Sequence, residues 1–310
     1  RDWSSDVCSS DLSIALEDDE TFKVRLSNPT GASQTTIISD VANISTQEND
    51  THIFLKNLDS RQGRVFNGAN NGDQTGFSVA GVGDINGDGL SDLIMGAKNI
   101  TVNGNDDAGG VVVVYGKTSS FTSSIDVSSL TVNDGFVIHG INVNDYTGDQ
   151  VSSGDINGDG IDDFAVAALG VDGTIKSDIG SVYVIFGNSN IGASGAGDLS
   201  ALDGTTGFVI KGSTTEQSIG VSISGLGDVN GDGFDDFIFG NRNANISESY
   251  VIFGNSSFSA SASIDTLDGN SGFKITTIAS DYSDYSLNGA GDVNGDGLND
   301  IIVGIPGNED

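Results

Sequence analysis

The chain has 310 residues and carries 12 lysines and arginines against 44 aspartates and glutamates, a formal net charge of −32. Such an acidic surface repels phosphate backbones and anionic lipid, which argues against nucleic acid and membrane surfaces as partners. Apolar residues make up 36% of the chain and recur in short runs, so a folded protein is predicted rather than a disordered one. These runs are strand-sized and too short for membrane insertion.

The first twelve residues are set apart from the rest. The stretch from Arg1 to Leu12 resembles the translation of a sequencing-library adapter and contains the only cysteine, Cys8, and the only tryptophan, Trp3. We therefore treat residues 1–12 as an artefact and expect the true N-terminus to be missing. The remaining chain has no cysteine, which excludes disulfides, thiolate catalysis and cysteine-ligated zinc.

Residues 13–50 differ in pattern from everything that follows. The stretch from Glu17 to Pro29 (EDDETFKVRLSNP), with an alternating strand predicted at Phe22 to Leu26, resembles the end of a Calx-β domain, although Asn49 departs from that family's acidic ending. The resemblance implies a small β-sandwich remnant. The calcium ligands that it implies are Glu17, Glu20 and Asp50. Residues 51–62 are expected to be a linker or a first strand leading into the next domain.

Residues 63–310 contain a fourfold internal repeat. The pattern D-x-N-G-D-G-x-x-D begins at Asp84, Asp155, Asp228 and Asp292, in steps of 71, 73 and 64 residues. A second landmark, a glycine before a short apolar run, begins at Gly63, Gly135, Gly207 and Gly272, in steps of 72, 72 and 65 residues. Two markers in register define repeat units. The predicted units are 63–134, 135–206, 207–271 and a partial 272–310.

Each unit is predicted to hold four short strands rich in Val, Ile, Phe and Tyr, bounded by Gly, Asn and Asp. In the second unit these strands are Phe136 to His139, Gln150 to Ser153, Phe164 to Ala168 and Ser181 to Phe186. Equivalents of the last strand are Gly110 to Tyr115 and Tyr250 to Phe253. Four strands per unit and no sustained helical period predict an all-β fold, a β-propeller of four-stranded blades. A parallel β-helix, which needs shorter repeats, is the second choice.

The repeated loop has the chemistry of a calcium site. Side-chain oxygens stand at its positions 1, 3, 5 and 9, and Ca²⁺ takes about six to eight oxygen ligands, whereas Mg²⁺ keeps its waters. Glycine at position 6 permits a sharp reversal, and position 7 would add a backbone carbonyl. About four Ca²⁺ ions are therefore expected, one per loop. The predicted ligands are Asp84, Asn86, Asp88, Leu90 and Asp92; Asp155, Asn157, Asp159, Ile161 and Asp163; Asp228, Asn230, Asp232, Phe234 and Asp236; and Asp292, Asn294, Asp296, Leu298 and Asp300.

The loop pattern allows two other interpretations. The loops could be Asx-rich turns without a metal, but four copies with the same acids and the same glycine favour calcium. An EF-hand needs a bidentate acid at position 12. That position holds Met95, Val166, Phe239 and Val303, each inside an apolar run, so an EF-hand is excluded.

The flanks of the loop carry a family resemblance. The stretches from Gly76 to Asp84, from Asp92 to Ala97 and from Gly110 to Gly116 resemble the FG-GAP repeats of integrin α-subunit propellers and their bacterial relatives, over roughly residues 61–310. The resemblance implies that each loop binds Ca²⁺ between strands of one blade and stiffens it. Such propellers usually close with about seven blades. Three blades and part of a fourth predict an open fragment that needs the rest of the same polypeptide.

No pattern indicates an enzyme. The two histidines are His52 and His139, and the counterparts of His139 in the other units are Asn67, Lys211 and Thr276, which is typical of a solvated surface. Neither a nucleophile elbow with partners nor a phosphate-binding loop is present. The acid pairs Asp162-Asp163 and Asp235-Asp236 are explained by the metal loop, with the first member of each pair outside it.

The function predicted from these features is a calcium-binding extracellular scaffold. It would act as an adhesion module of a large secreted or cell-surface bacterial protein, with an extracellular protein or glycan as its ligand. The resemblance supports this, because Calx-β domains beside FG-GAP repeats are common in long bacterial adhesins. The alternative is a non-catalytic accessory propeller of a secreted hydrolase. Fold analogy alone does not establish either role.

Overall fold

The computed structural model describes residues 34–37, 64–118, 124–171, 179–192, 198–212, 218–241, 247–277 and 286–304. These residues form strands and 3₁₀ turns arranged in five sheets. Within the described ranges, no helix has the length and apolarity that a membrane crossing requires. The predicted strand Phe22 to Leu26, the three implied Calx-β ligands and residues 51–62 lie outside this part of the chain.

Antiparallel blades are the main architectural unit, which confirms the all-β propeller fold predicted from the sequence. The first blade contains β3 (Val79–Gly83), β4 (Asp92–Gly96), β5 (Gly110–Val114) and β7 (Gly135–His139). The second contains β8 (Thr147–Gly154), β9 (Asp163–Ala168), β10 (Ser181–Ile185) and β11 (Gly207–Lys211). The third contains β12 (Ile223–Gly227), β13 (Asp236–Gly240), β14 (Ser247–Ile252) and β16 (Gly272–Thr277). A two-stranded sheet of β17 (Ser286–Gly291) and β18 (Asp300–Gly304) follows.

The structural blades are offset by one strand from the sequence repeats. The outer strand of the second blade, β11, begins the third repeat, and β10 pairs with it from Ser181 opposite Lys211 to Ile185 opposite Gly207. β7 and β16 complete the first and third blades in the same way. Each repeat therefore links two blades covalently, because its first strand closes the blade before it.

The remaining strands lie on the outside of this arrangement. β1 (Gln34–Ile37) pairs antiparallel with β2 (Arg64–Asn67), and β6 (Ser124–Asp126) pairs with β2 in parallel. β15 (Ser261–Ser263) pairs in parallel with β11. In the described part of the chain, 3₁₀ turns follow β6 and β15 and precede β11, at Val127–Ser129, Ile264–Thr266 and Leu199–Ala201. Each begins at a side chain that accepts a hydrogen bond from the turn, Asp126, Asp198 or Ser263.

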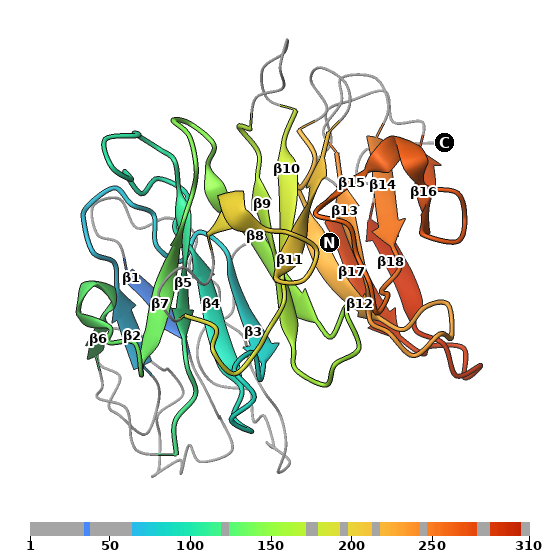
Figure 1. Ribbon diagram of the computed structural model, residues 1–310, viewed down its shortest axis with the longest axis horizontal. Coiled ribbons are helices and arrows are strands. Elements are labelled where there is room, and N and C mark those ends of the chain that lie inside the picture. The colour runs from blue at the N-terminus through green and yellow to red at the C-terminus, as the bar shows by residue number, and fades with distance from the viewer. Residues whose placement is uncertain are drawn as a thin grey trace, which may run out of the picture.

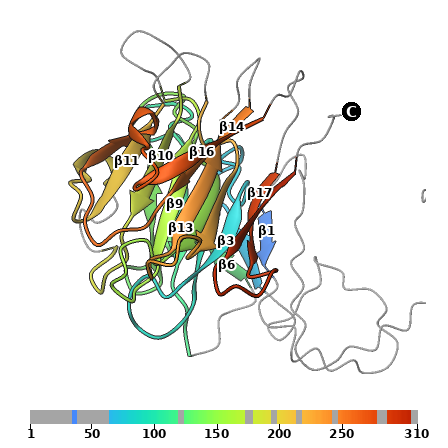
Figure 2. The same ribbon diagram turned by 90° about the vertical axis from the view of Figure 1, so that its right-hand side faces the viewer.

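Apolar layers between successive blades form the core. One layer joins the first two blades and contains Val82, Ile94 and Phe164, all fully buried. The next joins the second and third blades and contains Phe208 and Phe237. The blades stand side by side in chain order from blue to red (Figure 1). In the turned view, the outer strand β11 lies on the side opposite the inner strands β3 and β17 (Figure 2).

The landmark glycines of the repeat are required by the close pairing of the outer strand. Gly207 has φ +140°, and a Cβ there would overlap the carbonyl oxygen of Val184 in β10. Gly135 and Gly272 have φ values of +149° and +139°, and a Cβ at either position would likewise overlap a carbonyl oxygen of the neighbouring strand. The second sequence landmark thus marks the point where each outer strand joins its blade.

We expect Gly207→Ala to lower the free energy of unfolding by about 3 kcal/mol, because it adds both backbone strain and overlap with a fixed carbonyl. Gly81→Ala is the matched control, since Gly81 lies in a strand, lacks a positive φ and has open space at its Cβ position. Urea denaturation of both variants measures the difference. Equal midpoints would contradict this account of the landmark.

Candidate metal centres

Four loops of identical pattern join the first two strands of each blade. They connect β3 to β4, β8 to β9, β12 to β13 and β17 to β18, so they lie at corresponding ends of their blades (Figure 1). All the predicted ligand residues fall within the described part of the chain. Positions 4 and 6 of every loop are glycines with φ between +71° and +90°. The reversal expected at position 6 is therefore present, and position 4 contributes a second one.

Side-chain oxygens turn toward the inside of each loop. In the second loop, the amide of Asp159 donates to Asp155 Oδ1 at 3.1 Å and to Asn157 Oδ1 at 2.8 Å. The amide of Gly160 donates to Asp155 Oδ2 at 3.0 Å, and that of Ile161 donates to Asp159 Oδ1 at 2.9 Å. The other three loops repeat all four bonds at 2.7–3.2 Å. Positions 1 and 3 thus present oxygens to a single shared amide in every loop.

The aspartate at position 9 ties the loop to the rest of its blade. Asp163 is fully buried, and its carboxylate accepts from the amides of Ile156 at 2.9 Å, Asn157 at 3.1 Å and Gly187 at 2.8 Å. Gly187 follows the third strand, β10, so one side chain joins the loop to two strands. Asp92 and Asp236 make the corresponding bonds to Gly116 and Gly254.

The fourth loop retains only part of this arrangement. Asp300 accepts from the amide of Val293 at 2.8 Å and from Asn294 Nδ2 at 3.2 Å, and it is partly exposed. The described residues of this sheet include no third strand and therefore no glycine equivalent to Gly187. Asp300 is thus a natural comparison for the buried aspartates.

Burial and charge shift the titration of these aspartates. Burial is the largest cause and raises the pKa of Asp163 to about 8, with smaller contributions from the neighbouring charges of Asp159 and Asp155. It raises the pKa values of Asp92 and Asp236 to about 6, again assisted by two loop aspartates each. The acids at positions 1 and 5 therefore lie near enough to position 9 to repel it. A cation placed among them would relieve that repulsion.

The metal-free chain is expected to lose stability as the pH rises from 5 to 8. Folded pKa values above the ordinary aspartate value mean that the folded state holds extra protons, so this stabilisation is complete near pH 4 and is lost as the pH passes about 6 and then about 8. Partial burial lowers the pKa of His139 although the residue is exposed overall, and this opposes the trend, but it is one group against several. Thermal melts in calcium-free buffer measure this; a melting temperature higher at pH 8 than at pH 5 would contradict it.

The donor set fits a hard cation, although the loops satisfy their own oxygens. In the described residues, no three acidic, histidine or cysteine side chains are already gathered to hold a metal. The side-chain oxygens at positions 1, 3 and 5 instead accept hydrogen bonds from backbone amides of their own loop. A carboxylate offers about four lone-pair sites, so an oxygen that accepts from an amide can also bind an ion.

Other predicted features are placed clearly by the structure. The residues at position 12, Met95, Val166, Phe239 and Val303, lie within β4, β9, β13 and β18, so no acid stands there as in an EF-hand. His139 is exposed at the end of β7. The aspartates at position 8, Asp162 and Asp235, are not among the predicted ligands of their own loops, and each bonds to the preceding loop. Their partners, Asp84 and Asp155, lie in the preceding blade, so no local sequence pattern reveals these bonds.

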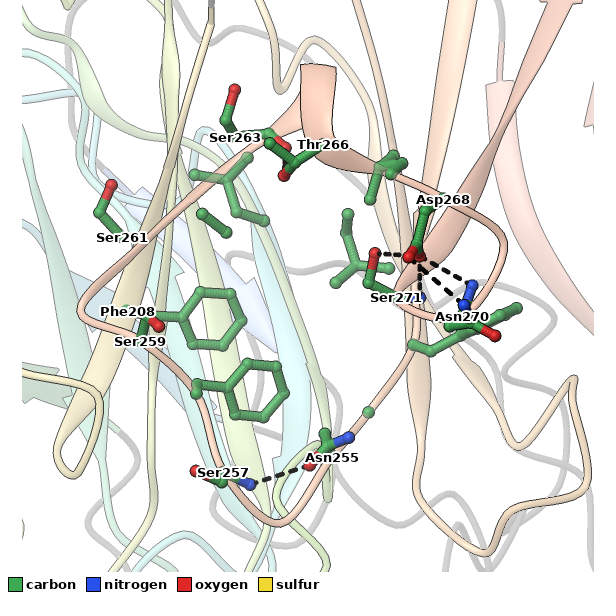
Figure 3. Close-up of a pocket in the computed structure, with 17 residues that line it drawn as sticks. Phe208, Asn255, Ser257, Ser259, Ser261, Ser263, Thr266, Asp268, Asn270 and Ser271 are labelled. Carbon is green, nitrogen blue, oxygen red and sulfur yellow. Dashed lines mark hydrogen bonds between the residues drawn. The ribbon is translucent and has the colours of Figure 1, made fainter.

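A cavity of about 460 Å³ lies between β11, β15 and the segment after β14. Stacked Phe208 and Phe258 rings, 4.3 Å apart, form one wall. On the other side Asp268 accepts hydrogen bonds from Asn270 and Ser271 (Figure 3). The carboxylate of Asp268 is thus already occupied by its own turn. The repeated loops, rather than this cavity, are therefore the candidate functional site.

Comparison with known proteins agrees with this geometry. The FG-GAP repeat family matches residues 147–185, which contain β8, the second loop, β9 and β10. The chain is 32% identical over 111 residues to integrin alpha-PS2 of Drosophila melanogaster, covering 34% of this chain and 7% of that protein. It is 27% identical to integrin alpha-5 of Xenopus laevis and 28% identical to integrin alpha pat-2 of Caenorhabditis elegans, covering 75% of this chain in each case and 20% and 18% of those proteins. The chain therefore spans a fifth or less of these relatives.

Proposed function

We propose that each of the four loops binds one calcium ion and that the loaded blades form a rigid extracellular interaction module. The observation that carries this proposal is the fourfold repetition of one oxygen-lined loop, with the same hydrogen bonds at the same place in successive blades. A turn that served only to reverse the chain would not need three aspartates and an asparagine each time. Calcium is the hard cation that such a flexible oxygen set suits.

The proposed ligands are the side chains at positions 1, 3, 5 and 9 and the carbonyl at position 7. Each occupied loop would set three aspartate charges against one divalent ion, so four ions would lower the net charge from −32 to −24. The buried aspartate at position 9 already connects loop and blade. An ion bound to it would therefore stiffen two strands as well as the loop.

The similarity to integrin α subunits supports an adhesive or interaction role, for which an extracellular protein or glycan is the fitting ligand. The proposal includes the remaining assignments. Residues 13–50 would be the end of a Calx-β domain, residues 63–310 the repeat region, and the whole part of a secreted or surface protein of bacterial type. Further polypeptide would supply the other blades of the propeller.

A binding screen tests this role. The chain is immobilised and probed with arrays of glycans and extracellular matrix proteins, in calcium and again in EGTA. At least one ligand should bind in calcium, be released by EGTA and return when calcium is restored. Absence of any binding in calcium, or binding that EGTA leaves unchanged, would contradict a calcium-dependent interaction module.

A further inference from the structure

Neighbouring loops are joined by pairs of hydrogen bonds that cross from one blade to the next. The amide of Asp162, at position 8 of the second loop, donates to the carbonyl of Asp84 at 3.0 Å. In return the amide of Asp84 donates to Asp162 Oδ2 at 2.8 Å. Asp84 is position 1 of the first loop, so its backbone is held on both sides by a residue of the next blade.

The same contact recurs between the second and third loops. The amide of Asp235 donates to the carbonyl of Asp155 at 3.1 Å, and the amide of Asp155 donates to Asp235 Oδ2 at 3.0 Å. Between the third and fourth loops, the amide of Asn299 donates to the carbonyl of Asp228 at 2.9 Å. Three successive junctions therefore use position 8 of one loop to hold position 1 of the loop before it.

An apolar contact accompanies the hydrogen bonding at each of the three junctions. The residue at position 7 of one loop lies over the glycine at position 4 of the preceding loop, as Ile161 lies over Gly87. Phe234 lies over Gly158 and Leu298 over Gly231 in the same way. A Cβ on Gly83, directly before the first loop, would overlap the Asp162 carboxylate. The junction is thus closely packed, with little freedom for position 1 to move independently of the next blade.

We propose that Asp162 and Asp235 are positioning residues for the calcium loop of the preceding blade, and that adjacent calcium sites are coupled through them. This inference rests on the proposed calcium binding. Position 1 supplies a ligand carboxylate, so fixing its backbone orders that ligand before the ion arrives. An ion in one loop in turn orders the contact to its neighbour, and coupling of this kind is reciprocal. Binding along the row of loops is therefore positively cooperative.

The test uses the full chain labelled with ¹⁵N-glycine and follows the position-6 amides, Gly89 in the first loop and Gly160 in the second, during calcium titration. Asp162→Ala should weaken calcium binding at the first loop about tenfold, the effect of losing roughly one hydrogen bond to a charged group. Asp162→Asn keeps an accepting oxygen and should stay within about threefold of the unaltered chain. Ser91→Ala is the matched control, because Ser91 holds position 8 of the first loop and is exposed.

Hydrogen exchange of the Asp84 amide in calcium-free buffer provides a second measurement. Asp162→Ala should accelerate it, whereas Asp162→Asn should restore protection. Equal weakening by Ala and Asn would show a charge effect and overturn the positioning role, as would an unchanged first loop. If the unaltered chain binds no calcium, the proposed function and the coupling both fail. If it binds calcium with independent sites, only the coupling fails.

Discussion

Calcium should raise the melting temperature of the chain by about 10 °C or more over the calcium-free protein. A ligand present at about one hundred times its dissociation constant stabilises a site by about 2.7 kcal/mol, so four sites together would add about 10 kcal/mol. That is comparable with the whole stability of a typical domain. The physical source is the relief of repulsion among three aspartates per loop, one of them buried in each complete blade.

Sodium at matched ionic strength is the control for simple screening, and magnesium is the control for divalent charge. Sodium should produce almost no shift, and magnesium a smaller one, because it gives up its waters reluctantly. Melts by differential scanning calorimetry in calcium, magnesium, sodium and EGTA measure all four conditions. Equal melting temperatures in calcium and sodium would reject the loops as ion sites.

Asp163→Ala should reduce the free energy of unfolding by about 3 kcal/mol even without calcium. The substitution leaves the amides of Ile156, Asn157 and Gly187 without their acceptor, at about 1 kcal/mol each. The loss falls at the junction of the loop with β9 and β10, at the centre of the second blade. Chemical denaturation in EGTA separates this structural effect from any loss of a bound ion.

Asp300→Ala is the matched control for that substitution. Asp300 occupies the same position 9 but is partly exposed, and among the described residues it accepts from one backbone amide, that of Val293. Its replacement should cost about 1 kcal/mol or less. A cost for Asp163→Ala no greater than for Asp300→Ala would mean that the buried carboxylate does not secure the blade.

The strands were predictable because their signals are local. β9 and β10 are continuous apolar runs between glycine- and aspartate-rich turns, and the structure places them within two residues of the predicted bounds. The pattern of glycines and acids likewise fixed the position of each loop. Periodicity established the repeat, because each unit contributes the same strands in the same order.

The offset between repeat and blade was not predictable in the same way. The residues of Gly207–Lys211 do not by themselves show whether this strand pairs with β10 before it or with β12 after it. That choice depends on packing between blades. The role of Asp162 is hidden for the same reason, because its partner Asp84 lies in another blade. The 3₁₀ turns are too short to produce a helical period.

Calorimetric titration of the full, metal-stripped chain with calcium measures directly whether the four loops bind ions. Saturable heat with a stoichiometry near four is expected, with a loss of about one ion for each loop in which the aspartates at positions 1 and 5 are replaced by asparagine. A folded β-sheet circular dichroism spectrum on the same sample, together with no saturable heat, would contradict it. The loops would then be turns held by their own hydrogen bonds.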